Sequence, residues 1–334
     1  MPFQQELNVA KEAVLKASLL CSAAQRGLVD AEKHDKADKS PVTVADYGAQ
    51  ALVLSTLAQA FPKDPAVGEE DSSDLRKPEN AELFARVVEY AQKIDGSLDA
   101  DSVLAAIDRG NHAGGADGRF WTLDPIDGTK GFLRGEQYAV ALALIENGQV
   151  VLGVLGCPNL PVDPANPDSE KGCILFAVQG QGAFQAPLSD IAAAVPISTD
   201  SVSEAAHAVF CESVESGHTA HGRSAAIAEA LGTAVEPFRM DSQCKYAAVS
   251  RGQASVYLRL PTRPGYEEKI WDHAAGYVVL QEAGGKIADT FGQPLDFSLG
   301  RTLKNNKGIV ATSPAVFETV VKAVVASGQS SKAV

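Results

Sequence analysis

Two apolar segments joined through Asn147-Gly148 restrict the fold of this chain more than any other feature of its 334 residues. Residues 138–145 and 150–155 are rich in aliphatic side chains, and only residues 146–149 separate them. An Asn-Gly pair at this place favours the tight turn of a β-hairpin. The middle of the chain is therefore expected to form paired strands.

Helices and strands are intermixed along the rest of the chain. Apolar residues recur at helical spacing from Leu7 to Leu20 and again from Asp46 to Phe61, which predicts two helices, the second ended by Pro62. Further strands are expected at residues 66–68, 119–124, 173–178, 182–184, 208–211, 255–260 and 309–312, and further helices within 71–118 and at 224–231, 243–250, 272–282 and 314–325. Such mixing favours layers of sheet and helix over a barrel or a helical bundle.

Charge and cysteine content limit the partners of the chain. The net charge is −13, so the chain is expected to avoid nucleic acid polymers and anionic membranes. The five cysteines are widely spaced and form no Cys-x-x-Cys pair, which favours reduced, buried thiols in an intracellular protein. No apolar run approaches the roughly 18 residues of a membrane span. We therefore expect a cytoplasmic protein. A monomer is expected as well.

The strongest chemical signal is the segment WTLDPIDGT at residues 121–129. Asp124 and Asp127 lie at the end of an apolar strand, which Pro125 is expected to stop. The turn can present both carboxylates and the Ile126 carbonyl to one point. Oxygen ligands of this kind suit a hard cation such as Mg²⁺.

Gly128 and Thr129 complete this turn. Their N–H groups are free to bind phosphate oxygens, and glycine lets the backbone approach a ligand closely. Metal ligands beside a phosphate cradle are what metal-assisted hydrolysis of a phosphate ester requires. The alternative is a plain surface turn, since Asp, Pro and Gly all favour turns.

Other charged residues occur in similar places. Glu69, in the segment GEED, follows a short apolar strand, while Asp272 in WDHAAG and Asp46 in PVTVAD lie at the expected starts of helices. Taken singly, the acidic triplet would be a solvated surface and each aspartate a helix cap. Lys245 and Arg259 could bind a second phosphate group or be ordinary surface cations.

Together these segments resemble a known superfamily. PVTVAD, GEE, WTLDPIDGT and WDHAAG occur in the order found in the lithium-sensitive, magnesium-dependent phosphatases, which include inositol monophosphatase and fructose-1,6-bisphosphatase. The run 121–159 and the segments DSQCKY, VYLRLP and KIWDH are most similar to the 3′(2′),5′-bisphosphate nucleotidase family. The resemblance covers essentially the whole chain and is weaker at residues 71–105 and 162–205.

The resemblance implies an α+β fold, a layered αβαβα sandwich with mixed sheets. It places the metal site between an N-terminal half, residues 1–160, and a C-terminal half, residues 161–327, followed by a flexible tail at 328–334. Residues 162–172, rich in Pro and Asp, depart from the family pattern and are expected to form a surface insertion.

The site residues follow from the same resemblance. The implied metal ligands, around two or three Mg²⁺ of which Li⁺ would displace one, are Glu69, Asp124, Asp127, Asp272 and the Ile126 carbonyl. The residues implied to orient or deprotonate the attacking water are Asp46, Glu69 and Thr129. The residues implied to bind the transferred phosphate are Gly128 and Thr129. The residues that match nucleotide-binding positions are His218, Ser242, Lys245 and Arg259.

The implied activity is hydrolysis of adenosine 3′,5′-bisphosphate to AMP and phosphate, which clears a by-product of sulfate transfer. 3′-Phosphoadenylyl sulfate is a further candidate substrate. The alternatives are an inositol polyphosphate 1-phosphatase or inositol monophosphatase, and a non-catalytic cation-binding protein of the same fold. Lys130-Gly131-Phe132, which follows the DGT segment, favours the nucleotidase, as do Lys245 and Arg259.

Overall fold

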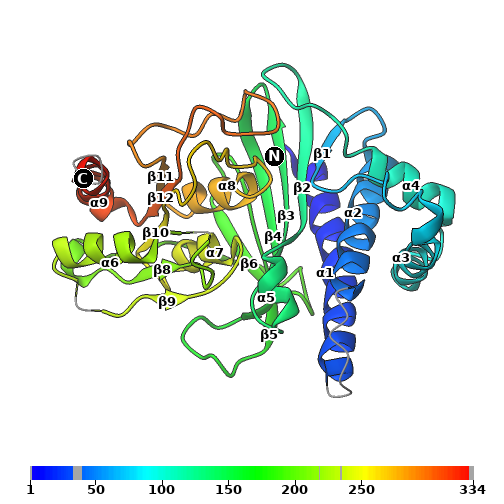
Figure 1. The fold of residues 1–334 in the computed structure, drawn as a ribbon, viewed down its shortest axis with the longest axis horizontal. Coiled ribbons are helices and arrows are strands. Elements are labelled where there is room, and N and C mark those ends of the chain that lie inside the picture. The colour runs from blue at the N-terminus through cyan, green and yellow to red at the C-terminus, as the bar shows by residue number, and fades with distance from the viewer. Residues whose placement is uncertain (1, 33–39, 218, 234, 331–334) are drawn as a thin grey trace.

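The computed structural model describes residues 2–32, 40–217, 219–233 and 235–330. Its elements form layers in the order helix, sheet, helix, sheet, helix, with the N-terminal helices at one end of the molecule and the C-terminal helix at the other (Figure 1). The layered α+β sandwich expected from the sequence is therefore confirmed.

The first layer consists of two long helices, α1 (Gln4–Glu32) and α2 (Ser40–Ala60). They pack against each other and against one face of the larger sheet. A 3-10 turn at Pro78–Asn80 leads into α3 (Ala81–Ile94) and α4 (Ala100–Asp108), which lie against α2 on the side away from the sheet (Figure 1). Helices are thus confirmed in both N-terminal segments and within residues 71–118.

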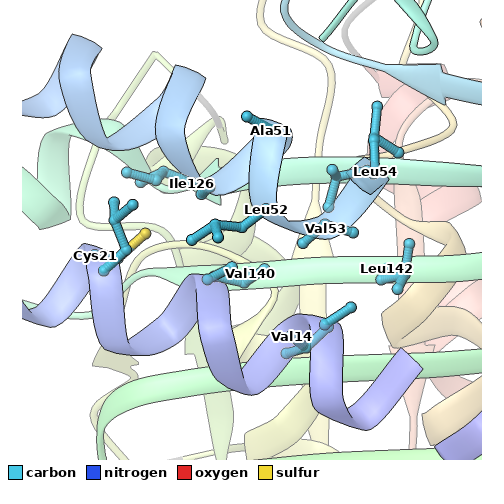
Figure 2. Close-up of a cluster of buried hydrophobic side chains, with 14 of the residues drawn as sticks. Val14, Cys21, Ala51, Leu52, Val53, Leu54, Ile126, Val140 and Leu142 are labelled. Atoms are coloured by element: carbon cyan, nitrogen blue, oxygen red, sulfur yellow. The ribbon is translucent and has the colours of Figure 1, made fainter. Parts of the chain in front are cut away.

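Apolar side chains fill the space between these helices and the sheet (Figure 2). Val14 and Cys21 of α1 and Leu52 of α2 form one buried cluster with Val140 and Leu142 of the sheet, and none of the five is more than 1% exposed. Full burial of a Val or Leu side chain stabilises the folded state by about 1.5–3 kcal/mol. The helical layer therefore gives the sheet a rigid support.

The larger sheet has seven strands, which lie in space in their order along the chain. They are β1 (Ala66–Gly68), β2 (Arg119–Asp127), β3 (Ala139–Glu146), β4 (Gln149–Pro161), β5 (Lys171–Val178), β6 (Ala183–Pro187) and β7 (Val195–Ile197). β1 and β2 are parallel, and the later neighbours are antiparallel. Asn147 and Gly148 connect β3 to β4 with φ values of 49° and 75°, as a type I′ turn requires, so the expected hairpin is confirmed.

Strand β2 does not stop at Pro125, so that expectation from the sequence is wrong. The strand continues to Asp127, and its register with β3 shifts between Asp124 and Asp127. Proline lacks the N–H that a ladder hydrogen bond needs, and a bulge leaves a residue unpaired, so Pro125 is accommodated at this shift. Both aspartates consequently remain part of the sheet.

The smaller sheet has five strands, which in spatial order are β11 (Lys286–Ala288), β12 (Ile309–Thr312), β10 (Val256–Arg259), β8 (Phe210–Glu212) and β9 (Phe238–Arg239). Its strand pairs are partly parallel and partly antiparallel. Helices α7 (Cys244–Ser250) and α8 (Ala274–Glu282) lie between the two sheets. Helices α6 (His221–Ala230) and α9 (Phe317–Ser330) cover the outer face of the smaller sheet. The short helix α5 (Thr129–Leu133) and 3-10 turns at Ala205–His207 and Pro314–Val316 complete the fold.

The expected boundary at residue 160 falls near the end of β4, and β5, β6 and β7 continue the same sheet beyond it. Buried residues from both sides of this boundary share the apolar cluster between the sheets. Helix α9 includes residues 328–330, where the tail was expected to begin, and residues 331–334 lie outside the described residues. The division into halves stays a prediction.

Two further expectations concern the surface and the thiols. Residues 163–168 are exposed, as expected of a surface insertion. All five cysteines are buried and free. Among the helices of the described ranges, none has the length and apolar character needed to span a membrane.

Candidate metal centre

Four acidic residues, from three segments that are distant along the chain, meet at one edge of the larger sheet. Glu69 follows β1, and Asp124 and Asp127 lie at the end of β2. Because β1 and β2 are parallel and adjacent, their carboxyl ends lie side by side. Asp272 comes from the segment before α8 and lines the same pocket as the other three.

The pocket has a volume of about 390 Å³. Besides the four acidic residues, its lining includes most of the other positions that the sequence singled out, namely Ile126, Gly128, Thr129, Ser242, Lys245 and Arg259. His218 lies outside the described residues. The structure therefore brings together residues from both sheets and from the layer between them.

At Gly128 the DGT turn packs closely against Ser242. The Gly128 φ of 89° lies in the left-handed region, and a Cβ at this position would come within 2.8 Å of the Ser242 Cβ. Ser242 itself has a φ of 67°, which is uncommon for a residue other than glycine. Such backbone conformations persist only where the surrounding structure enforces them, and they cluster at functional sites.

The acidic residues strongly affect one another's ionisation. Burial raises the pKa of Asp124, and the charges of Glu69 and Asp127 raise it further. Burial also raises the pKa of Asp272 to about 6, against the opposing charge of Arg259. The pKa of Glu69 rises to about 8 through burial of its carboxyl group and the nearby charge of Asp272. Glu69 as a residue is exposed to the water of the pocket, which screens part of this effect.

This group of oxygens fits a divalent cation. Asp124 is 2% exposed, and its Oδ1 atom has no hydrogen-bond partner among the described residues. A buried carboxylate oxygen without a partner is costly, and its repulsion by neighbouring carboxylates adds to that cost. Carboxylate and carbonyl oxygens are the ligands that Mg²⁺ prefers. A cation held here would satisfy the Asp124 oxygen and offset the repulsion.

A second acidic group beside the pocket has a different explanation. Glu268, Asp272 and His273 offer possible ligand atoms within 4.8 Å of one another. Glu268, however, already forms an ion pair with Arg259 at 2.8 Å and lies 3.3 Å from His273 Nε2. Although burial opposes it, the hydrogen bond with His273 and the charge of Arg259 lower the pKa of Glu268 to about 2. Glu268 is therefore satisfied by protein groups.

Asp46 is not at the start of a helix, so that expectation is wrong. It lies well inside α2, which begins at Ser40 because Val42 and Val44 are already buried in the apolar cluster. Asp46 is 9% exposed and is not among the residues that line the pocket. Burial and the charges of Glu70 and then Glu69 raise its pKa, which places it next to the acidic group.

Thr129 is exposed and lines the pocket as the first residue of α5. Its hydroxyl donates a long hydrogen bond of 3.4 Å to the Ile126 carbonyl, one of the proposed metal ligands. Among the described contacts it makes none to Asp46. The hydroxyl is thus held only weakly and stays available to a molecule in the pocket.

The two expected cations are built into the pocket wall rather than exposed on the surface. Lys245 is 2% exposed, and its Nζ donates to the carbonyl oxygens of Ser242, at 2.8 Å, and Met240, at 3.3 Å. Arg259 pairs with Glu268 and lies 3.5 Å from Asp272. Lys245 is buried without an ion pair among the described residues, whereas the charge of Arg259 is largely compensated.

Reasoning from the sequence missed three residues that support this site. Arg301 donates to the Gly68 carbonyl at 2.6 Å, directly before Glu69, and also to two carbonyls in the loop before β2. Gln50 of α2 exchanges two hydrogen bonds with the backbone of Glu70. Gln243 contacts the segments that carry Asp127 and Asp272. No spacing rule in the sequence connects these residues to the acidic positions.

Comparison with known proteins identifies the family. A solved inositol monophosphatase from Anabaena (Nostoc) sp. PCC 7120 has the same fold, with a TM-score of 0.64 and 20% identity over 98% of this chain and 97% of that one. The model of the inositol monophosphatase family matches residues 3–329. The chain belongs to the inositol monophosphatase family.

Within this inositol monophosphatase family, closer relatives share a more specific name. A 3′(2′),5′-bisphosphate nucleotidase of Schizosaccharomyces pombe is 47% identical over 342 residues, which cover 98% of this chain and 96% of the relative. A protein of the same name from Emericella nidulans is 44% identical over 351 residues, covering 97% of this chain and 98% of the relative. Members of the inositol monophosphatase family generally depend on Mg²⁺. The resemblance inferred from the sequence motifs is thus confirmed.

Proposed function

We propose that this chain is a magnesium-dependent 3′(2′),5′-bisphosphate nucleotidase, a phosphoric monoester hydrolase that converts adenosine 3′,5′-bisphosphate to AMP and phosphate. The proposal rests on the pocket in which the unpartnered Asp124 oxygen and three further acidic residues lie beside the Gly128 turn. Relatives of that name match this chain over nearly its full length. 3′-Phosphoadenylyl sulfate, which carries the same 3′-phosphate, is proposed as a further substrate.

The proposed metal ligands, for two or three Mg²⁺, are Glu69, Asp124, Asp127, Asp272 and the Ile126 carbonyl. When bound, Mg²⁺ would polarise phosphate oxygens and lower the pKa of a coordinated water. The contribution of the chain is a cluster of oxygens that parallel strands and the β2 bulge hold in place before the cation arrives. Such preorganisation avoids the cost of gathering like charges during the reaction.

Water attack and phosphate binding are assigned to the DGT turn and its neighbours. The described backbone hydrogen bonds outside helices and strands include none donated by the N–H groups of Gly128 and Thr129, and both residues line the pocket. These N–H groups are proposed to bind the oxygens of the transferred phosphate. Thr129, Glu69 and Asp46 are proposed to orient the water. Burial and the charges of Glu70 and Glu69 raise the pKa of Asp46, which makes its carboxylate a better proton acceptor. The water oxygen bonds to phosphorus as the bond to the 3′-oxygen breaks. The water gives up one proton and the 3′-oxygen takes one up from solvent, so AMP and phosphate leave.

The second phosphate of the nucleotide is assigned to Lys245, with Arg259, Ser242 and His218 completing the nucleotide site. Lys245 supports this role because its buried ammonium group contacts, among the described residues, two carbonyl oxygens and the aromatic face of Tyr257 at 5.2 Å. A buried cation without a carboxylate partner is ready to pair with an anionic ligand. Arg259 is held by Glu268, which fixes its orientation at the pocket wall.

A phosphate-release assay over a panel of substrates tests the proposed function. The panel contains adenosine 3′,5′-bisphosphate, 3′-phosphoadenylyl sulfate, inositol 1-phosphate and inositol 1,4-bisphosphate, each with Mg²⁺ and with excess chelator. We expect fastest release from the adenosine bisphosphate with Mg²⁺, and loss of that activity in Asp124→Asn. Asp163→Asn, in the exposed insertion, is the matched control that should keep it.

Two results would overturn the proposal. Faster turnover of the inositol phosphates would identify an inositol phosphatase instead. Absence of phosphate release from every substrate with Mg²⁺ present would identify a non-catalytic cation-binding protein.

We further propose that the protein acts as a monomer in the cytoplasm, on a small nucleotide. Five free, buried thiols support a reducing compartment. Light scattering of the purified protein tests the monomer, and microscopy of the tagged full chain tests the compartment. A stable dimer, or enclosure of the protein in an organelle, would contradict the respective proposal.

A further inference from the structure

Gln243 links the two chain segments that supply Asp127 and Asp272. It immediately precedes α7 and is 2% exposed. Its backbone N–H donates to Asp127 Oδ2. Its side-chain Nε2 donates to the Trp271 carbonyl at 2.8 Å, and its Oε1 accepts from the Gly276 N–H at 2.9 Å. Gln243 therefore bonds directly to one proposed metal ligand, Asp127. It also bonds to the backbone on both sides of another, Asp272.

The bond to Gly276 also caps a helix. Gly276 is in the first turn of α8, where backbone N–H groups have no partner within the helix. The residue at the N-cap position, His273, makes no side-chain cap hydrogen bond, because its ring nitrogens face Tyr246 and Glu268. The Gln243 side chain thus takes the place of a cap and helps to fix where α8 begins, two residues after Asp272.

The backbone around Gln243 leaves it little freedom. Ser242, the residue before it, has a φ of 67° and lies against Gly128, so the start of α7 is pressed onto the DGT turn. Gly276 is equally tight, since a Cβ there would come within 2.3 Å of the Tyr246 ring. Neither segment can shift without breaking a bond to Gln243, so the separation of Asp127 and Asp272 depends on its amide.

We infer that Gln243 is a positioning residue, whose amide sets the spacing between Asp127 and Asp272 at which both can bind the same cluster of divalent cations. This inference rests on the proposed metal site but not on the identity of the substrate. An ordinary buried glutamine would contribute to stability alone. A positioning role additionally predicts that its loss weakens cation binding, since residues that orient metal ligands typically change affinity or activity by about 10- to 100-fold.

The test compares Gln243→Met with Gln185→Met in the full-length protein. Methionine has a similar shape and makes no comparable hydrogen bonds. Gln185 of strand β6 is a matched control because it is also buried, at 5% exposure. Its side chain likewise makes two hydrogen bonds, to Val162 and to Arg251. Mg²⁺ affinity is measured by calorimetry without substrate and by the rise in melting temperature with Mg²⁺, and urea unfolding reports stability.

We expect both variants to lose stability and only Gln243→Met to bind Mg²⁺ about 10- to 100-fold more weakly. In phosphate release, its Mg²⁺ requirement should rise while KM for the nucleotide at saturating Mg²⁺ stays near wild type. Equal Mg²⁺ affinity of the two variants would overturn the inference. If phosphate release fails in the wild type but this difference in Mg²⁺ affinity remains, the proposed function falls and the positioning role stands.

Gln243→Glu provides a second measurement, which decides the matter if Gln243→Met does not fold. At alkaline pH, where its carboxyl group ionises, the glutamate keeps the acceptor for Gly276 but offers no donor to Trp271, and it adds negative charge next to the acidic group. A purely electrostatic role predicts tighter Mg²⁺ binding, whereas a positioning role predicts weaker binding. Tighter binding would therefore refute the assignment.

Discussion

Without divalent cations, the free energy of unfolding of this protein should fall as the pH rises. Burial raises the pKa of Asp272 to about 6 and that of Glu69 to about 8, so the folded protein holds protons that the unfolded chain releases. Stability decreases with pH wherever the folded state binds more protons than the unfolded state. The metal-free protein should thus be most stable at acidic pH and lose stability as the pH passes through these values.

The magnitude follows from the shift of each group. The pKa of Asp272 moves from an ordinary 3.8 to about 6. This shift lowers the free energy of unfolding above pH 7 by about 3 kcal/mol relative to acidic pH, and roughly half of that loss occurs between about pH 5 and about pH 8. Glu69 adds a further loss of stability as the pH rises from 4.5 to about 8. This loss is reduced because water in the pocket screens the Glu69 carboxylate. Glu268 has a pKa lowered to about 2, so its contribution to stability is lost only when the pH falls below 4.5. It therefore does not affect the change in stability between about pH 5 and about pH 8.

Urea unfolding in excess chelator and in excess Mg²⁺, between about pH 5 and about pH 8, measures the effect. We expect the chelated protein to lose at least about 1 kcal/mol over this range, and Mg²⁺ to stabilise it more at the alkaline end. Asp272→Asn, which cannot ionise, should flatten the metal-free profile. A metal-free stability that stays constant or rises with pH, or an equal gain from Mg²⁺ at both ends, would refute the reasoning.

Three further predictions concern the pocket. Gly128→Ala should destabilise the protein by about 1–3 kcal/mol in urea unfolding and abolish phosphate release. Gly180→Ala is the control, because Gly180 has a similar φ of 76° but no atom within 4 Å of a Cβ, so it should lose stability only through backbone strain. Equal losses of stability and activity in the two variants would contradict the close contact at Gly128. In phosphate-release kinetics, Lys245→Met should raise KM for adenosine 3′,5′-bisphosphate by about 10-fold or more, and KM for adenosine 3′-monophosphate should stay nearly unchanged. An equal rise in KM with both substrates would exclude Lys245 from recognition of the second phosphate. Millimolar Li⁺ should inhibit phosphate release in competition with Mg²⁺, and activity indifferent to Li⁺ would count against a third cation.

The parts of the fold that could be predicted are those that short stretches of sequence determine. Asn147-Gly148 defines its own turn, and Gly284-Gly285 ends α8 through local bonds, from Gly285 N–H to the Leu280 carbonyl at 2.9 Å and from Gly284 N–H to the Gln281 carbonyl at 3.0 Å. Pro125 was mispredicted because a bulge depends on the neighbouring strand, which the local sequence of β2 does not reveal.

The same distinction applies to the site. The resemblance of the sequence motifs to the phosphatase superfamily implied that the four acidic residues would meet. Taken singly, Glu69 could have been a solvated surface residue and Asp272 a helix cap. The helix start near Asp46 was wrong because burial of Val42 and Val44, a tertiary effect, extends α2 toward its N-terminus. Gln243 and Arg301 were missed because their roles consist of hydrogen bonds to distant backbone groups, which leave no periodic pattern in the sequence.

The bond from Arg301 to the Gly68 carbonyl spans 233 residues, and this has a consequence for biosynthesis. Strands β1 and β2 leave the ribosome long before Arg301 is translated, so the nascent sheet carries Glu69 on a strand end that lacks this bond. Loops of this length close late, because their ends must find each other through a large ensemble of conformations. High-affinity cation binding should therefore arise only when the last third of the chain has been made, which protects the growing chain from capturing metal in an unfinished site.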